Sequence, residues 1–318
     1  MVSDKVNKSL KKCSTKYIQL TTYNLLLLQL QFIFVSMGDA NFLFYNGKLS
    51  KTGKLLISPD NRSFRYGDGF FETIKMVNGK IQLADYHFER LFSSLELLQF
   101  QKPVYFTPEY LQEQVTTLAK KNFHHKLARV RITIFRGEGG LYEVDNHFPH
   151  HLIQTWQLNR SNNHLNENGL VLGIYKDAKK VCDHFSHIKS NNYLAYVMAA
   201  LWTKKQKLND AILLNPFDRV ADATIANVFI VKDGVIKTPA LSEGAVNGVM
   251  RRHILQSLRK ENMPVEETQL QVNDLMEASE IFLTNAIYGI RWVKQLGDSG
   301  YTNQLSSLLD KNFIQPLF

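Results

Sequence analysis

The chain has 318 residues, of which 44% are hydrophobic and 21% are charged. This length is sufficient to bury a sizeable core and predicts one or two domains, and no biased or repeated tract indicates a disordered or solenoid protein. The net charge is +9, but no run of Lys and Arg is interleaved with aromatic residues, so we expect no nucleic-acid partner, while small anions fit the charge.

The first residues of the chain differ from the rest. They combine a basic start with an apolar stretch near 23–36. This resembles a weak signal peptide, but two glutamines interrupt the apolar core and no small-residue cleavage site follows. The stretch is too short to span a bilayer, so we expect no membrane partner. We favour a non-functional N-terminal extension over 1–36 with a natural start at Met37.

Cysteine usage suggests the cellular compartment. The two cysteines, Cys13 and Cys182, have no near neighbour of their own type. The sequence therefore holds neither a disulfide framework nor a zinc pattern. We expect a cytoplasmic protein without a metal.

Strand signals dominate the start of a smaller N-terminal α/β domain, predicted over 37–158. "FLFYNGKL" followed by "GKLLIS" predicts two short strands about the Asn46-Gly47 turn. A strand over 70–77 then turns at Asn78-Gly79 into a second strand over 80–83. "LARVRITIFRG" predicts a further strand with alternating exposed arginines.

Two amphipathic helices are predicted within the same domain. Asp85 is a candidate cap for the first helix, whose apolar face consists of Phe88, Leu91, Leu95 and Leu98. The second begins with Thr107 as its cap and Pro108 at its first position.

A polar stretch over 159–168 is predicted as a linker to a C-terminal domain over 169–318. Beyond it, strands and helices alternate, which predicts a second α/β domain. The expected elements are the strands "LVLGIY", "DAILLNP", "ANVFIVKDG" and "EIFLTNAI" and helices over 191–206, 248–261 and near 303–312.

Lys189 lies in an otherwise apolar stretch, "HIKSNNYLAYV". Desolvation lowers the pKa of a buried lysine, and a neutral amine can condense with an aldehyde to form a Schiff base. The structural alternative is a lysine at a strand end whose ammonium group reaches water.

Two further segments carry candidate binding groups. Asp222, in "RVADATIANVFIVKDG", is predicted just before an apolar strand; it fits either a strand-end cap or a buried carboxylate that keeps a heterocyclic nitrogen protonated. Gly244 and Gly248, in "LSEGAVNGVMRRHIL", flank a loop that opens a helix, and free N–H groups at a helix start bind phosphate. Arg90 offers a planar fork for phosphate, or a surface salt bridge with Asp85 or Glu89.

These motifs, in their order, resemble the class IV pyridoxal-phosphate aminotransferase family over about 40–293. The family includes branched-chain aminotransferases, D-amino-acid aminotransferases and aminodeoxychorismate lyases. The resemblance implies a two-domain fold-type IV enzyme with the site between the domains, bound pyridoxal 5'-phosphate, a small-molecule amino substrate and a homodimer.

The resemblance also implies roles for individual residues. Lys189 matches the lysine that bonds to the cofactor and moves the proton between Cα and C4′, and Arg90 matches the phosphate-holding arginine. Val249 and Met250 match the backbone donors of the phosphate cup, and Tyr193 a partner of the phenolic oxygen. The loop that lines the phosphate and substrate side is matched by Thr284, Asn285 and Ala286.

One position departs from the family pattern, because Asp222 stands where the family has glutamate. The carboxylate is one methylene shorter, which affects the expected strength of the electron sink rather than cofactor binding. "VNGVMRR" and "LTNAIYG" look closer to the lyases than to the branched-chain enzymes, so we expect 4-amino-4-deoxychorismate lyase activity. A branched-chain or D-amino-acid transaminase is the first alternative, and a pyridoxal-phosphate binder without turnover the second. Arg136 is a candidate for a substrate carboxylate or an exposed strand-end arginine.

Overall fold

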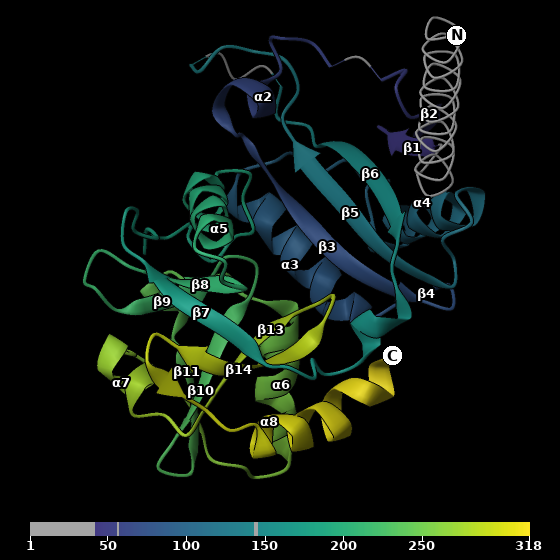
Figure 1. Ribbon diagram of the computed structural model, residues 1–318. Helices are drawn as coiled ribbons and strands as arrows, with labels where there is room; N and C mark the ends of the chain where they lie inside the picture. The colour runs from purple at the N-terminus through teal and green to yellow at the C-terminus, as the bar shows by residue number, and fades with distance from the viewer. Residues whose placement is uncertain (1–41, 56, 143–145) are drawn as a thin grey trace, which may run out of the picture. The chain divides into compact units, whose positions relative to one another are not determined.

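Two β-sheets organise the chain in the computed structural model (Figure 1). The structure describes residues 42–55, 57–142 and 146–318, and 42–318 form one compact unit. The predicted extension over 1–36 lies outside the described residues. Among the described residues, no helix has the length and apolar character needed to cross a bilayer. The division of the unit into two domains stays a prediction.

The first sheet is antiparallel throughout, in the order β2-β1-β6-β5-β3-β4. Its strands are β1 (Phe42–Tyr45), β2 (Lys48–Lys51), β3 (Gly69–Val77), β4 (Lys80–Ile81), β5 (Leu127–Phe135) and β6 (His150–Gln157). Both predicted Asn-Gly turns are present, since all four of their residues have positive φ. The described residues of "GKLLIS" lie outside the strands, because β2 ends at Lys51.

Three helices accompany this sheet: α2 (Arg62–Tyr66), α3 (Ala84–Leu97) and α4 (Pro108–Lys121). Thr107 caps α4 as predicted, since its hydroxyl accepts a hydrogen bond from the Tyr110 N–H. The predicted cap of α3 is wrong. Leu83 occupies that position with left-handed backbone, and Asp85 lies in the first turn. Burial of the apolar faces of α3 and α4 against β3, β5 and β6 forms the core of this half.

The second sheet is mixed, in the order β12-β11-β10-β13-β14-β7-β8-β9, with β15 paired to β14. Its strands are β7 (Leu170–Tyr175), β8 (Asp210–Leu214), β9 (Val220–Ala223), β10 (Asn227–Lys232), β11 (Val235–Pro239), β12 (Val265–Thr268), β13 (Glu280–Asn285), β14 (Gly289–Leu296) and β15 (Ser299–Gly300). Asp222 precedes the predicted apolar strand, which is β10, and itself lies within the short strand β9.

The helices of this half are α5 (Leu194–Lys205), α6 (Val249–Lys260), α7 (Val272–Met276) and α8 (Gln304–Leu309). Short helical turns complete it: η1 (Arg160–Asn163), η2 (Leu241–Glu243), η3 (Asp310–Ile314) and η4 (Gln315–Leu317). Helices α6 and α8 pack on β13, and η1 lies in the predicted linker. The architecture confirms the expected mixed α/β fold, with one antiparallel and one mixed sheet.

Candidate active site

A cavity of about 290 Å³ lies where the two sheets approach each other. Its volume is near the lower bound for small-molecule sites, roughly 300 Å³. The charged groups among its lining residues are one acid and four cations: Asp222, Arg90, Arg129, Arg131 and Lys189. This excess of positive charge favours an anionic ligand.

Eight of the ten predicted site residues line this one cavity: Arg90, Lys189, Tyr193, Asp222, Val249, Thr284, Asn285 and Ala286. They come from α3, from β9 and β13, and from the loops or helix ends beside them. The other two lie outside the lining. Met250 is buried in the apolar core under α6, so only its backbone N–H is available at the helix start, and Arg136 lies in a separate polar network.

The segment that carries Lys189 is held against the first sheet by backbone hydrogen bonds. The Phe71 N–H donates to the Lys189 carbonyl at 2.9 Å, and the Asn191 N–H donates to the Gly69 carbonyl at 2.9 Å. The segment therefore pairs antiparallel with the start of β3, although it lies far from β3 in sequence. This pairing fixes the backbone of Lys189 at the junction of the two halves.

The Lys189 amine points into an aromatic environment. Its Nζ lies 4.8 Å from the ring centroid of Phe71 and 5.6 Å from that of Tyr193. Burial, together with the nearby Arg90 charge, lowers the pKa of Lys189 to about 8. A substantial fraction of this amine is neutral near physiological pH, as nucleophilic attack on a carbonyl requires.

Arg90 is fixed from behind by a buried acid. Its Nε and Nη2 donate to the two carboxylate oxygens of Glu72 at 2.7 and 2.6 Å, and its Nη1 donates to the Asn247 carbonyl at 2.8 Å. Glu72 also lies 2.6 Å from Nδ1 of His87. Burial alone would raise the pKa of Glu72, but Arg90 and His87 lower it to about 2. The carboxylate is thus charged, and it fixes the guanidinium at the cavity wall with N–H groups left over beyond these three bonds.

The start of α6 forms the neighbouring wall. Gly248 is its N-cap and provides no side-chain acceptor, so the first N–H groups of the helix stay open to a ligand. A Cβ at Gly248 would lie 1.8 Å from Oδ1 of Asn227, so only glycine permits this close approach. Nearby, the buried Oγ1 of Thr284 has no hydrogen-bond partner within the described chain. An anion held here would satisfy both groups.

Asp222 is almost completely buried at the cavity wall. Its carboxylate accepts hydrogen bonds from the Asn227 amide at 3.0 Å, the Val246 N–H at 3.0 Å and the Tyr196 hydroxyl at 3.3 Å. Burial raises the pKa of Asp222 to about 7 even though the Val246 N–H and nearby Lys180 favour the charged form. A further cationic partner in the cavity would stabilise the carboxylate.

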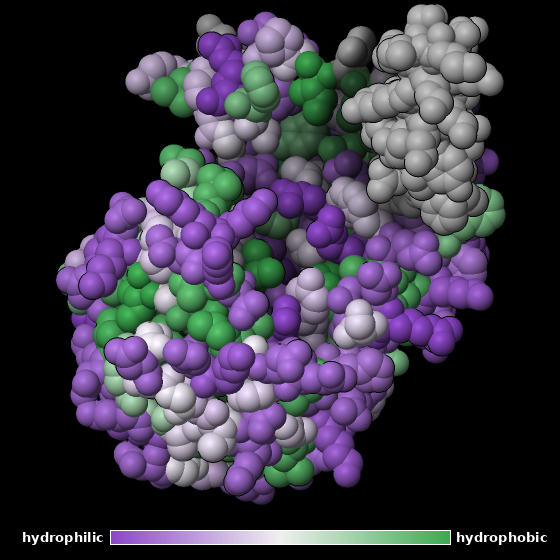
Figure 2. Space-filling view, in the orientation of Figure 1, coloured by the Kyte–Doolittle hydropathy of each residue, from purple (hydrophilic) through white to green (hydrophobic). Residues whose placement is uncertain are grey.

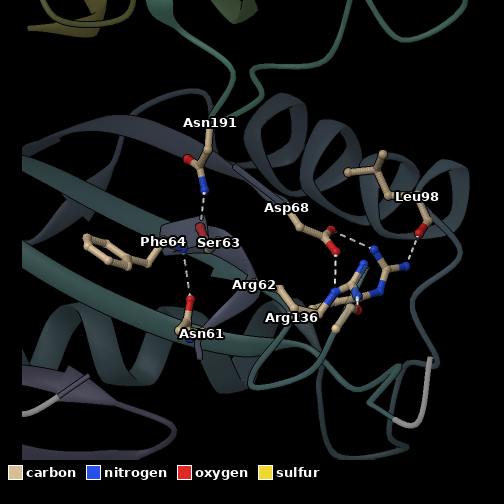
Figure 3. A network of polar contacts seen from close by, with 9 residues as sticks. Asn61, Arg62, Ser63, Phe64, Asp68, Leu98, Arg136 and Asn191 are labelled. Atoms are coloured by element: carbon tan, nitrogen blue, oxygen red, sulfur yellow. Dashed lines mark hydrogen bonds and ion pairs between the residues drawn. The ribbon is translucent and has the colours of Figure 1, made fainter. Parts of the chain in front are cut away.

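Arg136 belongs to a different network, in which it and Arg62 flank one carboxylate (Figure 3). Nη1 of Arg136 donates to Asp68 at 2.7 Å, Nε of Arg62 donates to the same carboxylate at 2.8 Å, and Arg136 also donates to the Leu98 carbonyl. Asn191, two residues beyond Lys189, donates to the Ser63 hydroxyl of α2 at 3.0 Å. The network therefore lies beside the segment that carries Lys189, and Arg136 does not line the cavity.

Residues 69–296 match the family described as Amino-transferase class IV. The chain belongs to the class IV aminotransferases.

Named relatives within this family have different activities. An aminodeoxychorismate lyase from Vibrio harveyi is 31% identical over 72% of this chain and 83% of its own length. A D-alanine aminotransferase from Listeria monocytogenes is 27% identical over 76% of this chain and 82% of its own length. The crystal structure of a branched-chain aminotransferase from the thermophilic archaeon Thermoproteus uzoniensis, with norvaline, has a TM-score of 0.78 at 20% identity, covering 88% of this chain and 95% of that one. The last comparison shows the fold.

Class IV aminotransferases use pyridoxal 5'-phosphate, which confirms the expected cofactor at the level of the family. The residues present fit this group. The unpartnered Thr284 hydroxyl, the open start of α6 and the guanidinium of Arg90 form a cradle for a phosphate. Lys189 supplies an amine and Asp222 a buried acid on the walls of the same cavity.

Two arginines on the open side of this class IV site, Arg129 and Arg131, were not predicted as site residues from the sequence. Arg129 and Arg131 alternate with the buried Val130 and Ile132 on β5, so they share the face of the sheet opposite the helices. Arg131 Cζ lies 3.7 Å from the ring centroid of Phe71. The strict alternation in "RVRITIF" could have identified them. It places Arg129 and Arg131 on one face of the strand, whereas Arg136 follows the last residue of the strand.

Proposed function

We propose that this class IV enzyme is a 4-amino-4-deoxychorismate lyase, which releases pyruvate and leaves 4-aminobenzoate, a folate precursor. The observation that carries the proposal is the 31% identity to the Vibrio harveyi lyase over 83% of that protein. The cavity chemistry agrees with it, because one lysine, one buried acid and the two arginines of β5 surround the same space.

The cofactor would be held at its phosphate by Arg90, by the backbone N–H groups of Val249 and Met250 and by the Thr284 hydroxyl. When bound, pyridoxal phosphate supplies an aldehyde that condenses with amines and a ring that accepts electrons. Tyr193 lies beside Lys189, where it would contact the ring. This arrangement leaves the arginines of β5 available for the substrate.

Lys189 would act as the base of the reaction. Its lowered pKa leaves a neutral Nζ that can accept the proton from the substrate α-carbon. Asp222 would hold a proton at the ring nitrogen, since a buried carboxylate is most stable opposite a positive charge. The bond between the substrate ring and the enol-ether oxygen then breaks, and the electrons left by the α-proton make the ring aromatic as 4-aminobenzoate. The enolpyruvate that leaves takes up a proton and becomes pyruvate.

Arg129 and Arg131 would bind the carboxylates of the substrate. Both line the cavity, and the side chain of Arg131 is held by its packing on Phe71 and by a hydrogen bond to the Thr133 hydroxyl at 3.2 Å. 4-Amino-4-deoxychorismate carries two carboxylates, so two guanidinium groups on one strand match its charge. Asn285 and Ala286 form the facing wall.

The deciding experiment is product analysis with the purified, cofactor-loaded chain. We expect 4-aminobenzoate and pyruvate in equal amounts from 4-amino-4-deoxychorismate, and slow or no keto acid formation from a panel of D-alanine and branched-chain amino acids. Rapid transamination of that panel without 4-aminobenzoate would instead support the transaminase alternative, which the 27% identity to the Listeria enzyme favours. A spectral response without any product would indicate a passive binder.

We also propose a homodimer in a reducing cytoplasm. Four apolar side chains on α5 share one face, Leu194, Val197, Met198 and Leu201, and each is between 43% and 74% exposed. In Figure 2, hydrophobic side chains gather on the surface over this helix. Soluble monomers rarely expose such a stripe, and a second copy of the chain would cover it. Two cysteines without near neighbours support the compartment.

The assembly can be tested with one charge on this stripe. Leu201→Glu should convert a dimer into a monomer in sedimentation velocity, because a carboxylate in an apolar interface loses its hydration. Thr117→Glu places the same carboxylate at an exposed position of α4 and should leave the dimer intact. A wild-type chain that is monomeric and fully active would refute the proposal.

A further inference from the structure

A second lysine, Lys75 on β3, is completely buried without an acidic hydrogen-bond partner among the described residues. Its Nζ donates to the carbonyl of Ile287 at 2.9 Å and to that of Asn162 at 3.1 Å. The ring centroid of Phe318 lies 3.1 Å from the same Nζ, within the range of a cation–π contact. Burying an ammonium group is costly unless its donors are satisfied. These contacts offset that cost and hold the side chain in one defined position.

Lys75 and the three groups that contact it come from four separate parts of the chain. Lys75 belongs to the first sheet, Ile287 to the loop between β13 and β14, Asn162 to η1 and Phe318 to the last residues of the sequence. Asp310 of η3 is the nearby acid that favours the charged amine, although burial lowers the pKa of Lys75 to about 7. One side chain thus ties the two halves of the unit together.

The loop that Lys75 holds is a wall of the cavity. Residues 285–288 all line the cavity. Oδ1 of Asn285 accepts hydrogen bonds from the N–H groups of Ile287 and Tyr288 at 3.0 and 2.9 Å, and its amide donates to the Ile225 carbonyl at 3.3 Å. The Ile287 N–H is therefore occupied within the loop, while its carbonyl is held by Lys75.

The end of the chain supports the same loop at a second point. Gly289 has a φ of +70°, and a Cβ there would lie 2.3 Å from Cγ2 of Ile314. The opposite wall is also linked to Lys75. Phe71 and Thr73 line the cavity from β3, and Lys75 is the next residue on their face of the strand, because side chains alternate with a period of two.

We propose that Lys75, with the Phe318 ring against it, is a positioning residue that fixes the 285–288 wall relative to β3 and thereby sets the affinity for the substrate. Lys75 would act only through the loop. The substrate part of this inference rests on the proposed function, whereas the loop part does not depend on it.

Lys75→Met tests both parts in the full-length, cofactor-loaded chain. It keeps the length of the side chain but removes the donors and the charge. Lys80→Met is the matched control, because Lys80 lies exposed on the partner strand of the same hairpin. We expect Lys75→Met to raise KM about tenfold with kcat changed less than about threefold, since a displaced binding wall weakens binding more than chemistry. Lys75→Arg should recover part of the loss.

Hydrogen exchange provides a readout that needs no substrate. The amides of Ile287 and Tyr288 should exchange on the order of tenfold faster in Lys75→Met than in Lys80→Met, because local opening of the loop exposes them. Phe318→Ala should change both quantities in the same direction by a smaller factor, and it replaces Lys75→Met if the latter does not fold. Exchange and KM equal to those of Lys80→Met, with only a lower melting temperature, would refute the positioning role.

If the wild-type chain forms no 4-aminobenzoate, the proposed function fails while the exchange experiment still tests the loop. Binding can then be measured as the spectral response of the bound cofactor to amino acids. In that case we expect Lys75→Met to bind these amino acids about tenfold more weakly than the wild-type chain. The loss of affinity should accompany the faster exchange.

Discussion

The two ends of the cavity hold their arginines in opposite ways. At the closed end, Arg90 is buried and bound by both oxygens of Glu72. At the open end, Arg129 is exposed and Arg131 is half-buried, and their charged groups contact aromatic rings, Trp156 and Phe71. A buried ion pair fixes a group in one orientation, whereas an arginine on a ring keeps its donors available.

This difference predicts that the two ends bind different kinds of group. We infer that the Glu72–Arg90 pair, with His87 behind it, is preorganised for a group that stays bound, such as a phosphate. Breaking a buried pair leaves an unpaired charge, which costs about 3–5 kcal/mol. We infer that the open end instead binds a substrate that enters and leaves. Variants at the reacting residues and at the two ends should therefore affect different measured quantities.

The largest expected effect belongs to Lys189, which lines the same cavity. Lys189→Ala should lower turnover by about 10⁴-fold, the upper range for a lost proton-transfer group, and should abolish the borohydride-reducible bond to pyridoxal phosphate. Cofactor should still bind at the closed end, because Arg90, Val249 and Thr284 are untouched. Dialysis and absorbance measure binding, and full activity would refute the assignment.

Asp222→Asn should lower turnover by about 10²-fold, equivalent to about 2.7 kcal/mol of barrier. The amide removes the charge that stabilises a protonated ring nitrogen, while cofactor content should stay near normal. Asp222→Glu should keep substantial activity, since it restores the residue expected for the family. Normal turnover of Asp222→Asn, measured by single-turnover kinetics, would show that another group serves the nitrogen.

A comparison of Arg131→Gln with Arg136→Gln distinguishes an arginine that lines the open end of the cavity from one that lies outside the cavity. Arg131→Gln should raise KM about 10- to 100-fold, because a hydrogen bond to a charged group contributes about 1.5–3 kcal/mol. Arg136→Gln should leave KM unchanged and lower the melting temperature, since Arg136 binds Asp68 and Leu98 outside the cavity. An elevated KM in the second variant alone would reverse this interpretation.

The smallest expected effect is a pH dependence. With the pKa of Lys189 at about 8, the neutral amine fraction rises through that pH and then levels off. Covalent capture of pyridoxal phosphate by the cofactor-free chain should therefore be about tenfold faster at pH 9 than at pH 7. Stopped-flow absorbance measures this rate, and a rate that continues to rise to about pH 10.5 would indicate an ordinary lysine.

Local sequence determined much of this protein. The Asn-Gly turns, the Thr107-Pro108 helix start and the glycine at Gly248 follow from backbone rules that operate over a few residues. The ordered motifs indicate the family, and they identify Lys189, Arg90 and Asp222 as candidate site residues without any geometry. Their chemistry requires specific residue types, which a sequence displays directly.

Only the tertiary structure decided which partners those residues have. Three examples are the pairing of Arg90 with Glu72 rather than Asp85 or Glu89, the separation of Arg131 from Arg136, and the contact of Lys75 with Ile287 and Phe318. All three depend on contacts between separate elements of the fold. The first two are set by packing within the first sheet and its helices, and the third by packing between the two sheets. A periodic pattern indicates which face of a strand a side chain occupies, but the group it meets there depends on packing between distant segments.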